Sequence, residues 1–278
     1  MIDSHNHTDF SEDCFIPLET MIDAAISKGI KHYTITDHLD LDYQDKRFTF
    51  ALDHAQRKAA IRQAQLKYKD HINIYLGLEC GVQPHVLEEV EDIIRQEAFD
   101  FVIASMHTTH KKDLYTKDFY QGLTPIQAYK AYLKEFAFCL DLMNEYDVVG
   151  HLDIVKRYEP SLQSVQLSEV EEEIIYLLKI IIRKNKGLEI NTSGYNDPFN
   201  HAFPHPQILK WYYELGGRII TLGSDAHFPE RIAQHYEKAL TMLESIGFEH
   251  ITLFKNRRPH TILLSDIKEA WLLTESNI

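Results

Sequence analysis

Short apolar runs alternate with longer helical stretches along the 278 residues, and this alternation is the feature that most limits the fold. Seven runs rich in Ile, Val, Leu, Tyr and Phe predict parallel strands, because strands covered on both faces have nearly continuous apolar sequences. The predicted strands are residues 2–5, 32–36, 74–78, 101–105, 148–150, 188–190 and 218–222. The predicted helices are residues 17–28, 51–68, 84–96, 125–144, 168–186, 206–215 and 230–245.

Seven consecutive strand–helix units predict an α/β fold in which parallel strands form a closed or nearly closed barrel. Residues 261–264 could supply an eighth strand near the end of the chain. An open doubly wound sheet is the alternative, because it shows the same alternation of strands and helices. The sequence contains no linker-like segment and no fixed repeat, so we expect a single domain over residues 1–278.

The composition argues against several classes of function. The chain has 29 Lys and Arg residues against 42 Asp and Glu residues, a net charge of −13, so we expect no nucleic-acid partner. The first residues lack the layout of a signal peptide and no apolar stretch could span a bilayer, so we expect a cytoplasmic protein without a membrane partner. The sequence does not indicate an oligomeric state.

The chain contains 16 histidines, and several of them stand with acidic residues at the ends of predicted strands. In α/β barrels the carboxyl ends of the strands form one rim, where functional side chains gather. The rim residues would be His5, His7, Asp37, His38, Glu79, His107, His151, Asp153, Glu189, Asn191, Asp225 and His227. One His-x-His pair is expected about once by chance at this histidine content, but repetition at strand after strand is not. Imidazoles and carboxylates together predict a site for Zn, Mn or Fe ions.

These segments occur in the order found in a known family. The chain resembles the polymerase-and-histidinol-phosphatase (PHP) superfamily in its Asp-x-His-x-His start at residues 3–7 and in five later motifs. Those motifs end at His38, Glu79, His107, Asp153 and His227. Residues 189–194 resemble its histidinol-phosphatase branch. The resemblance implies a distorted (β/α)7 barrel with three divalent metal ions, which hydrolyses L-histidinol phosphate to L-histidinol and phosphate.

The resemblance also implies which residues bind each ion. The first ion would take His5, His7, Glu79 and Asp225, and the second would share Glu79 and take His107 and His151. The third would take His38, His227 and Asp13, at whose position many relatives have histidine. Two ions that share a carboxylate can activate a water molecule for attack on phosphorus, which gives Glu79 a catalytic role.

Polar residues next to these ligands are predicted to act on the substrate. Asp153 could orient a ligand or accept a proton as a second catalytic group, or could merely cap a loop. Lys156 and Arg157 are candidates for binding phosphate, although a solvated basic pair is an alternative. Glu189 and Asn191 could bind the amine or imidazole of the substrate, or could brace the mouth of the barrel.

The expected partner is therefore a small-molecule phosphate ester, and other functions remain as alternatives. A PHP enzyme could instead act on phosphotyrosine or on nucleotides. A noncatalytic metal-binding scaffold is disfavoured, because the implied ligand set is complete. An amidohydrolase would have a bridging lysine at the fourth strand, where this chain has Ser105-Met106-His107.

Overall fold

A computed structural model describes residues 1–50, 52–198 and 200–275 of the chain. Parallel strands occupy the centre: β1 (Ile2–Asp3), β2 (His32–Ile35), β3 (His38–Leu39), β4 (Asn73–Gly81), β5 (Phe101–Ser105), β8 (Val148–Val149), β9 (Gly187–Asn191) and β10 (Ile220–Gly223). They are hydrogen-bonded in the order β1-β2-β4-β5-β8-β9-β10, and β3 also pairs with β4. The short strands β6 (Thr108–Thr109) and β7 (Lys112–Asp113) form a separate antiparallel pair.

The two edges of this sheet meet. The backbone N–H of Ser4, just after β1, donates to the carbonyl of Leu222 in β10 at 2.9 Å. The N–H of Asp225 donates to the carbonyl of His5 at the same distance. The sheet is therefore nearly closed into a barrel, which confirms the predicted α/β barrel of seven parallel strands and excludes the open doubly wound sheet.

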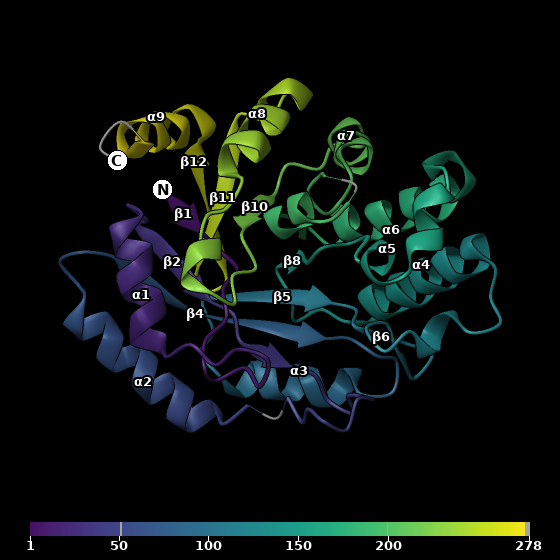
Figure 1. Ribbon diagram of the computed structural model, residues 1–278, viewed down its shortest axis with the longest axis horizontal. Helices are drawn as coiled ribbons and strands as arrows, with labels where there is room; N and C mark the ends of the chain where they lie inside the picture. The colour runs from purple at the N-terminus through teal and green to yellow at the C-terminus, as the bar shows by residue number, and fades with distance from the viewer. Residues whose placement is uncertain (51, 199, 276–278) are drawn as a thin grey trace.

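Helices surround the strands (Figure 1). They are α1 (Leu18–Ser27), α2 (His54–Lys67), α3 (Leu87–Gln96), α4 (Pro125–Leu142), α5 (Val155–Tyr158), α6 (Glu171–Arg183), α7 (Pro206–Glu214), α8 (Tyr236–Ile246) and α9 (Leu264–Glu275). Single 3-10 turns are η1 (Asp118–Tyr120), η2 (Pro160–Ser164), η3 (Leu167–Glu169), η4 (Thr192–Asn196) and η5 (Pro229–Arg231). The seven predicted helices correspond to α1–α4 and α6–α8, and residue 51, where the second was predicted to begin, lies outside the described residues.

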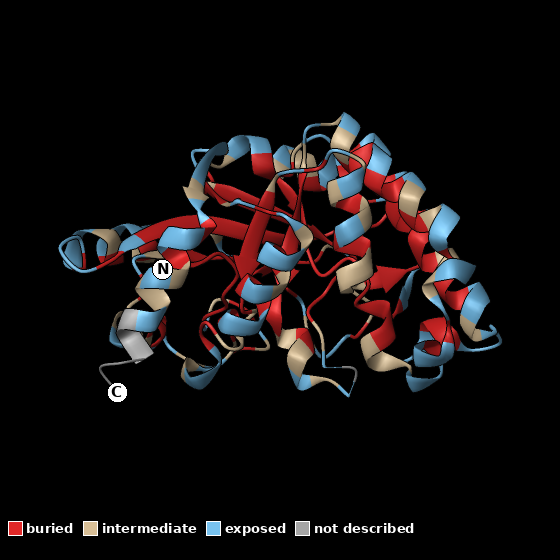
Figure 2. Cartoon of the chain, turned by 90° about the horizontal axis from the view of Figure 1, so that it is seen from above, coloured by how far each residue is buried: buried red, intermediate tan, exposed pale blue. Residues whose placement is uncertain are grey.

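The helices turn apolar faces toward the strands and polar faces outward. Figure 2 shows the strands as mainly buried and the helices as buried on one side only. One cluster of buried hydrophobic side chains extends from Met1 to Ile267. Within the described parts of the chain, none of the helices combines the length and apolarity that crossing a membrane requires.

The last part of the chain differs from the prediction. β11 (His250–Lys255) and β12 (Arg258–Leu263) form an antiparallel hairpin, so residues 261–264 do not supply an eighth barrel strand. The ring of Phe254 stacks on that of Phe101, at the start of β5, with centroids 5.2 Å apart. The hairpin thus packs against the amino end of the barrel, opposite the rim where the histidines were predicted.

Candidate metal centre

The segments that follow the barrel strands carry the predicted metal ligands to the carboxyl end of the barrel. Contacts between side chains link all nine of these residues into one cluster. They are His5, His7, Asp13, His38, Glu79, His107, His151, Asp225 and His227. Side chains spread over more than two hundred positions of the sequence therefore meet at one place.

Four of the residues converge on one point, and we call them the first group: His5, His7, Glu79 and Asp225. The Nε2 atoms of His5 and His7 lie 3.0 Å apart. Oε2 of Glu79 lies 3.1 Å and 3.5 Å from these two nitrogens, and Oδ1 of Asp225 lies 3.5 Å and 3.3 Å from them. Zinc ligands in a tetrahedron, each about 2.05 Å from the ion, would be about 3.3 Å from one another. Three members of the group, His5, His7 and Asp225, offer ligand atoms close enough together to hold one cation, and Glu79 lies beside its two imidazoles.

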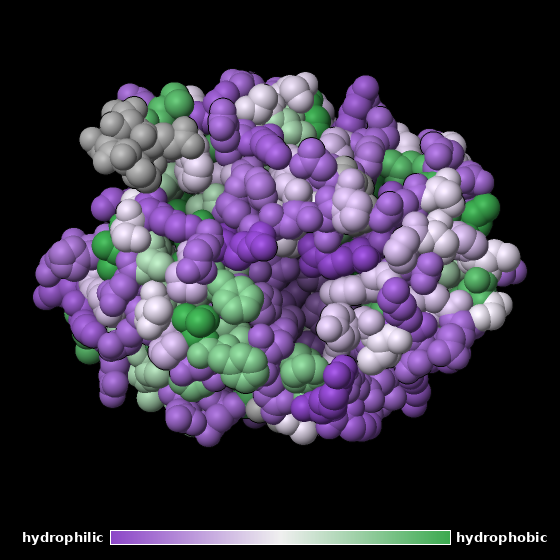
Figure 3. Space-filling model, viewed as in Figure 1, coloured by the Kyte–Doolittle hydropathy of each residue, from purple (hydrophilic) through white to green (hydrophobic). Residues whose placement is uncertain are grey.

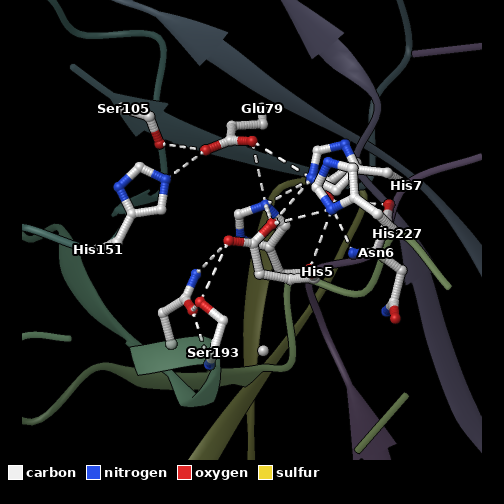
Figure 4. A network of polar contacts seen from close by, with 12 residues as sticks. His5, Asn6, His7, Glu79, Ser105, His151, Ser193 and His227 are labelled. Carbon is white, nitrogen blue, oxygen red and sulfur yellow. Dashed lines mark hydrogen bonds and ion pairs between the residues drawn. The ribbon is translucent and has the colours of Figure 1, made fainter. Parts of the chain in front are cut away.

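Glu79 is fully buried on β4 and turns its two oxygens in different directions (Figure 4). Oε2 faces the two imidazoles of the first group, those of His5 and His7. Oε1 accepts a hydrogen bond from the hydroxyl of Ser105 at 2.6 Å and lies 2.8 Å from Nε2 of His151 and 3.4 Å from Nε2 of His107. A carboxylate in this position can bridge one cation in the first group and another beside His107 and His151.

A third set of side chains surrounds Asp13. Its Oδ2 lies 3.2 Å from Nε2 of His227 and 3.5 Å from Nε2 of His38. The other ring nitrogen of His38, Nδ1, lies 3.2 Å from Oε2 of Glu79. The ring of His7 stacks on that of His38 and also on that of His227, with centroid distances of 4.4 Å and 4.1 Å. The third set is therefore in direct contact with the first group.

Burial and charge act in opposite directions on these side chains. Burial alone would raise the pKa of Glu79, but His5 and His38 hold it well below its usual range. Burial lowers the pKa of His7 to about 4, and the neighbouring rings of His227 and His38 add to this effect. A buried carboxylate and a neutral imidazole are the ligand forms that a divalent cation needs. Neighbouring carboxylates raise the pKa values of His5, His38 and His107 well above the usual range, so these imidazoles would have to lose a proton when a cation binds.

Two of the imidazoles are oriented by carboxylates behind them. Nδ1 of His5 lies 2.5 Å from Oε1 of Glu189, and Nδ1 of His107 lies 2.8 Å from Oδ1 of Asp40. A proton shared with these oxygens leaves Nε2 of each ring free to face a cation. Asp40 was not among the predicted site residues. It follows His38 by two positions, and side chains two apart in an extended segment point the same way, so the sequence does contain a signal for it.

Arg157 is the one predicted substrate-binding residue that lines the pocket above the cluster. Its Nε donates to Oδ2 of Asp197 at 2.8 Å, and its Nη2 donates to the hydroxyl of Ser193 at 2.7 Å. The guanidinium lies over the ring of Phe203, 4.8 Å from its centroid. These contacts hold the positive charge of Arg157 at the edge of the pocket.

The structure does not bring Glu189 or Asn191 into the pocket wall. Oε2 of Glu189 accepts hydrogen bonds from the backbone N–H of His151 at 3.0 Å and from the side-chain amide of Asn191 at 3.2 Å. That amide also lies 3.2 Å from Oδ2 of Asp225. Both residues therefore lie behind the ligands and support them, which corresponds to the bracing role left open by the sequence.

Asp153 and Lys156 are also outside the pocket wall. Asp153 is fully buried and accepts a hydrogen bond from the backbone N–H of His205 at 3.1 Å. Lys156 is buried as well, although it adjoins Arg157 in α5. Successive residues of a helix point about 100° apart, so only one of this basic pair can face the pocket. Both side chains therefore lie behind the pocket wall, and the ligand-orienting or proton-accepting role of Asp153 and the phosphate contact of Lys156 stay predictions.

A pocket of about 310 Å³ lies above the cluster. Carboxylates and imidazoles form one part of its wall, and five aromatic side chains form another: Tyr43, Phe48, Phe50, Tyr115 and Tyr158. Figure 3 shows a hollow near the middle of one face, with hydrophilic and hydrophobic side chains on its borders. These aromatic residues were not among the predicted site residues, because most of them lie in loops whose course no periodicity in the sequence reveals.

Comparison with known proteins places these observations in a family. The PHP domain pattern matches residues 3–193. A histidinol-phosphatase of Lactococcus lactis is 32% identical over 262 residues, which cover 92% of this chain and 95% of that protein. A protein named probable histidinol-phosphatase from Clostridium acetobutylicum is 31% identical over 255 residues, which cover 90% of this chain and 96% of its own length.

The fold agrees with a solved structure as well. The crystal structure of histidinol phosphate phosphatase from Lactococcus lactis, complexed with zinc, L-histidinol and phosphate, matches with a TM-score of 0.87 and 31% identity. The match covers 93% of this chain and 98% of that one. The chain therefore belongs to the PHP domain family.

Proposed function

We propose that this chain is a metal-dependent phosphomonoesterase that hydrolyses L-histidinol phosphate to L-histidinol and phosphate. The observation that carries the proposal is the convergence of nine potential metal ligands, linked by side-chain contacts, below a pocket. The reaction and the substrate come from the related protein, 31% identical over nearly the whole chain, whose crystal structure contains zinc, L-histidinol and phosphate. We also propose a cytoplasmic location and a single domain, as expected from the sequence.

Three divalent ions, Zn, Mn or Fe, would be held as the resemblance implies. The first would lie in the first group, the second between Glu79, His107 and His151, and the third between Asp13, His38 and His227. Divalent cations, when bound, activate water and neutralise phosphate oxygens. Glu79 would hold two of them at a fixed separation, because its two oxygens face different ligands.

Arg157 would bind the phosphate group of the substrate. Its Nε and Nη2 donate to Asp197 and Ser193, and Tyr158 is a further hydrogen-bonding neighbour, but a guanidinium has five N–H groups, so donors remain for a phosphate oxygen. Guanidinium–phosphate hydrogen bonds are charge-assisted and therefore strong. The contacts with Asp197 and Ser193 would keep the side chain in place before the substrate arrives, so little conformational entropy would be lost on binding.

The five aromatic side chains that line the pocket, which we call the aromatic wall, would bind the leaving group. L-Histidinol contains an imidazole and a protonated amine, and both interact favourably with aromatic faces. The five aromatic side chains of the pocket offer such faces, and one of them, Phe50, lies beside the ring of His38 with centroids 5.1 Å apart. This wall would favour histidinol phosphate over a phosphate ester whose leaving group is small and aliphatic.

The test is a phosphate-release assay with the metal-reconstituted protein. We expect kcat/KM for L-histidinol phosphate to exceed the values for phosphotyrosine and nucleoside monophosphates, and we expect a chelator to abolish all three activities. Metal analysis of the same preparation should give three ions per chain. A preference for phosphotyrosine or for nucleotides would refute the proposed substrate, and full activity after metal removal would refute the proposed mechanism.

A further inference from the structure

His7 differs from His5 in the group that contacts its Nδ1. His5 meets the carboxylate of Glu189 directly, whereas Nδ1 of His7 lies 3.1 Å from the hydroxyl oxygen of Ser11. A carboxylate can only accept a hydrogen bond, but a hydroxyl can donate or accept. The contact with Ser11 therefore does not by itself decide which nitrogen of His7 carries the proton.

The other contacts of Ser11 decide it. Its Oγ accepts a hydrogen bond from the backbone N–H of His38 at 3.0 Å and donates to Oδ1 of Asp37 at 3.2 Å. The same Oδ1 accepts the backbone N–H of Thr8 at 2.7 Å and the hydroxyl of Thr8 at 2.9 Å. A hydroxyl has one proton and two lone pairs. With its proton directed to Asp37 and one lone pair used by His38, Ser11 has only a lone pair left for His7.

Ser11 donates to Asp37 only if Asp37 is ionised, and the guanidinium of Arg57 keeps it so. Arg57 lies in α2 and is 1% exposed. Its Nε donates to Oδ2 of Asp37 at 2.6 Å, and its Nη2 donates to the carbonyls of Ile35 and Gly77, each at 2.8 Å. Since a guanidinium always carries its protons, both oxygens of Asp37 are acceptors and neither can donate to Ser11.

The carboxylates on the other side of His7 favour a proton on Nε2 instead of on Nδ1. Nε2 of His7 lies 3.3 Å from Oδ1 of Asp225 and 3.5 Å from Oε2 of Glu79. Either oxygen would accept a proton from Nε2, and a protonated Nε2 could not bind a cation. The ring therefore needs an acceptor at Nδ1 that competes with these two oxygens.

We propose that Arg57, acting through Asp37 and Ser11, keeps the proton of His7 on Nδ1 and so leaves Nε2 free to hold a cation. Arg57 and Ser11 are then positioning residues, since neither is among the proposed ligands. The inference rests on the ligand role of His7 in the proposed function. The new element is that the ligand role of His7 depends on Arg57, a buried arginine on α2, outside the barrel.

The test compares Ser11→Ala with Ser4→Ala. Both serines are buried in the segment after β1, but the hydroxyl of Ser4 has no hydrogen-bond partner among the described residues. Competition with a chelator, followed by metal analysis, should show that Ser11→Ala holds one zinc ion 10–100-fold more weakly than the wild type, the usual effect of losing such a supporting group. Ser4→Ala should hold zinc as the wild type does. Equal zinc retention by the two variants would overturn the proposal.

A spectroscopic measurement tests the proton directly. In the zinc-loaded protein labelled with ¹⁵N-histidine, the resonances that vanish in His7→Gln should show a proton on Nδ1 of His7, protected from solvent exchange. Ser11→Ala should lose that protection, while Arg57→Lys, which keeps the charge beside Asp37, should retain most of it. A His7 ring without a proton on Nδ1 in the wild type would overturn the inference. Failure to hydrolyse histidinol phosphate, with zinc binding and this proton intact, would refute only the proposed function.

Discussion

Gly223 ends β10 next to His5, and replacing it with alanine should displace this ligand. A Cβ atom at this position would lie 2.4 Å from Cβ of His5 and 2.6 Å from Oε1 of Glu189. Carbon atoms in ordinary contact are about 3.5 Å apart, so His5 would have to move by about 1 Å. Such overpacking costs about 1–3 kcal/mol of stability. A displacement of about 1 Å in a catalytic site can lower the rate about a hundredfold.

Gly187→Ala is the matched control. A Cβ there would lie 2.5 Å from Cγ2 and 2.7 Å from the carbonyl oxygen of Ile219, at the opposite end of the barrel from the ligands. Thermal denaturation should show similar losses of stability in the two variants, whereas the phosphate-release assay should show the loss of kcat/KM only in Gly223→Ala. If the two variants agreed in kcat/KM to within about threefold, the activity would not depend on the position of His5, and the reasoning would be refuted.

Three further substitutions test other parts of the site. Glu79→Gln should lower kcat by more than about a hundredfold and reduce the bound metal, since even the loss of a group behind a ligand costs 10–100-fold; unchanged metal content and rate would contradict the bridging role. Arg157→Met should raise KM for the phosphate ester about tenfold or more, because a hydrogen bond to a charged group contributes about 1.5–3 kcal/mol; initial rates with an unchanged KM would exclude the phosphate contact. Arg57→Met should lower the free energy of unfolding at neutral pH by about 3–5 kcal/mol, since it leaves a buried carboxylate unpaired. Burial alone would raise the pKa of Asp37, but Arg57 and the other donors hold it below its usual range. The ion pair therefore stabilises the fold above about pH 4, and the difference between wild type and Arg57→Met in urea unfolding should shrink as the pH falls below that value; a difference that stayed constant down to pH 3 would contradict this.

The strands were predictable where their buried side chains are apolar. Residues 101–105 were predicted with the bounds that β5 has. The prediction for β4 ended at residue 78, whereas the strand continues to Gly81. The next residue, Glu79, is polar, and a sequence does not show that other side chains will surround it inside a barrel. The part of the strand that matters most for the site was therefore the part that apolar periodicity could not reveal.

The terminal hairpin escaped prediction because of its turn. Asn256 and Arg257 connect β11 to β12 with positive φ angles of 49° and 61°. A two-residue hairpin turn of this kind commonly contains Asn-Gly, and the glycine is the usual signal in a sequence. An arginine in the left-handed conformation gives no such signal, so only part of β12 was expected, and as a parallel strand.

Apart from Asp13, which only the family resemblance indicated, the candidate ligands were predictable for a geometric reason that does not extend to the groups around them. Residues at the carboxyl ends of parallel strands share one rim whatever the details of packing, so a list of strand ends is also a list of neighbours. Arg157 and Lys156 follow such an end too, but they lie in a short helix, where the direction of each side chain depends on helical phase. Arg157 lines the pocket and Lys156 is buried beside it, a difference that the sequence of the pair does not show.

The charge of the site and the charge of the whole chain lead to different conclusions about phosphate. Five carboxylates surround the proposed cations or support their ligands: Asp13, Asp40, Glu79, Glu189 and Asp225. These five carboxylates carry five negative charges. Three divalent ions would supply six positive charges and leave the site with a charge of about +1, whereas two ions would leave it at about −1. Charges on the outer surface are screened beyond about 10 Å at moderate ionic strength, so the net charge of −13 acts weakly at the floor of a pocket. An acidic protein can therefore repel nucleic acid along its surface and still bind a small phosphate ester, provided that all three cation sites are filled.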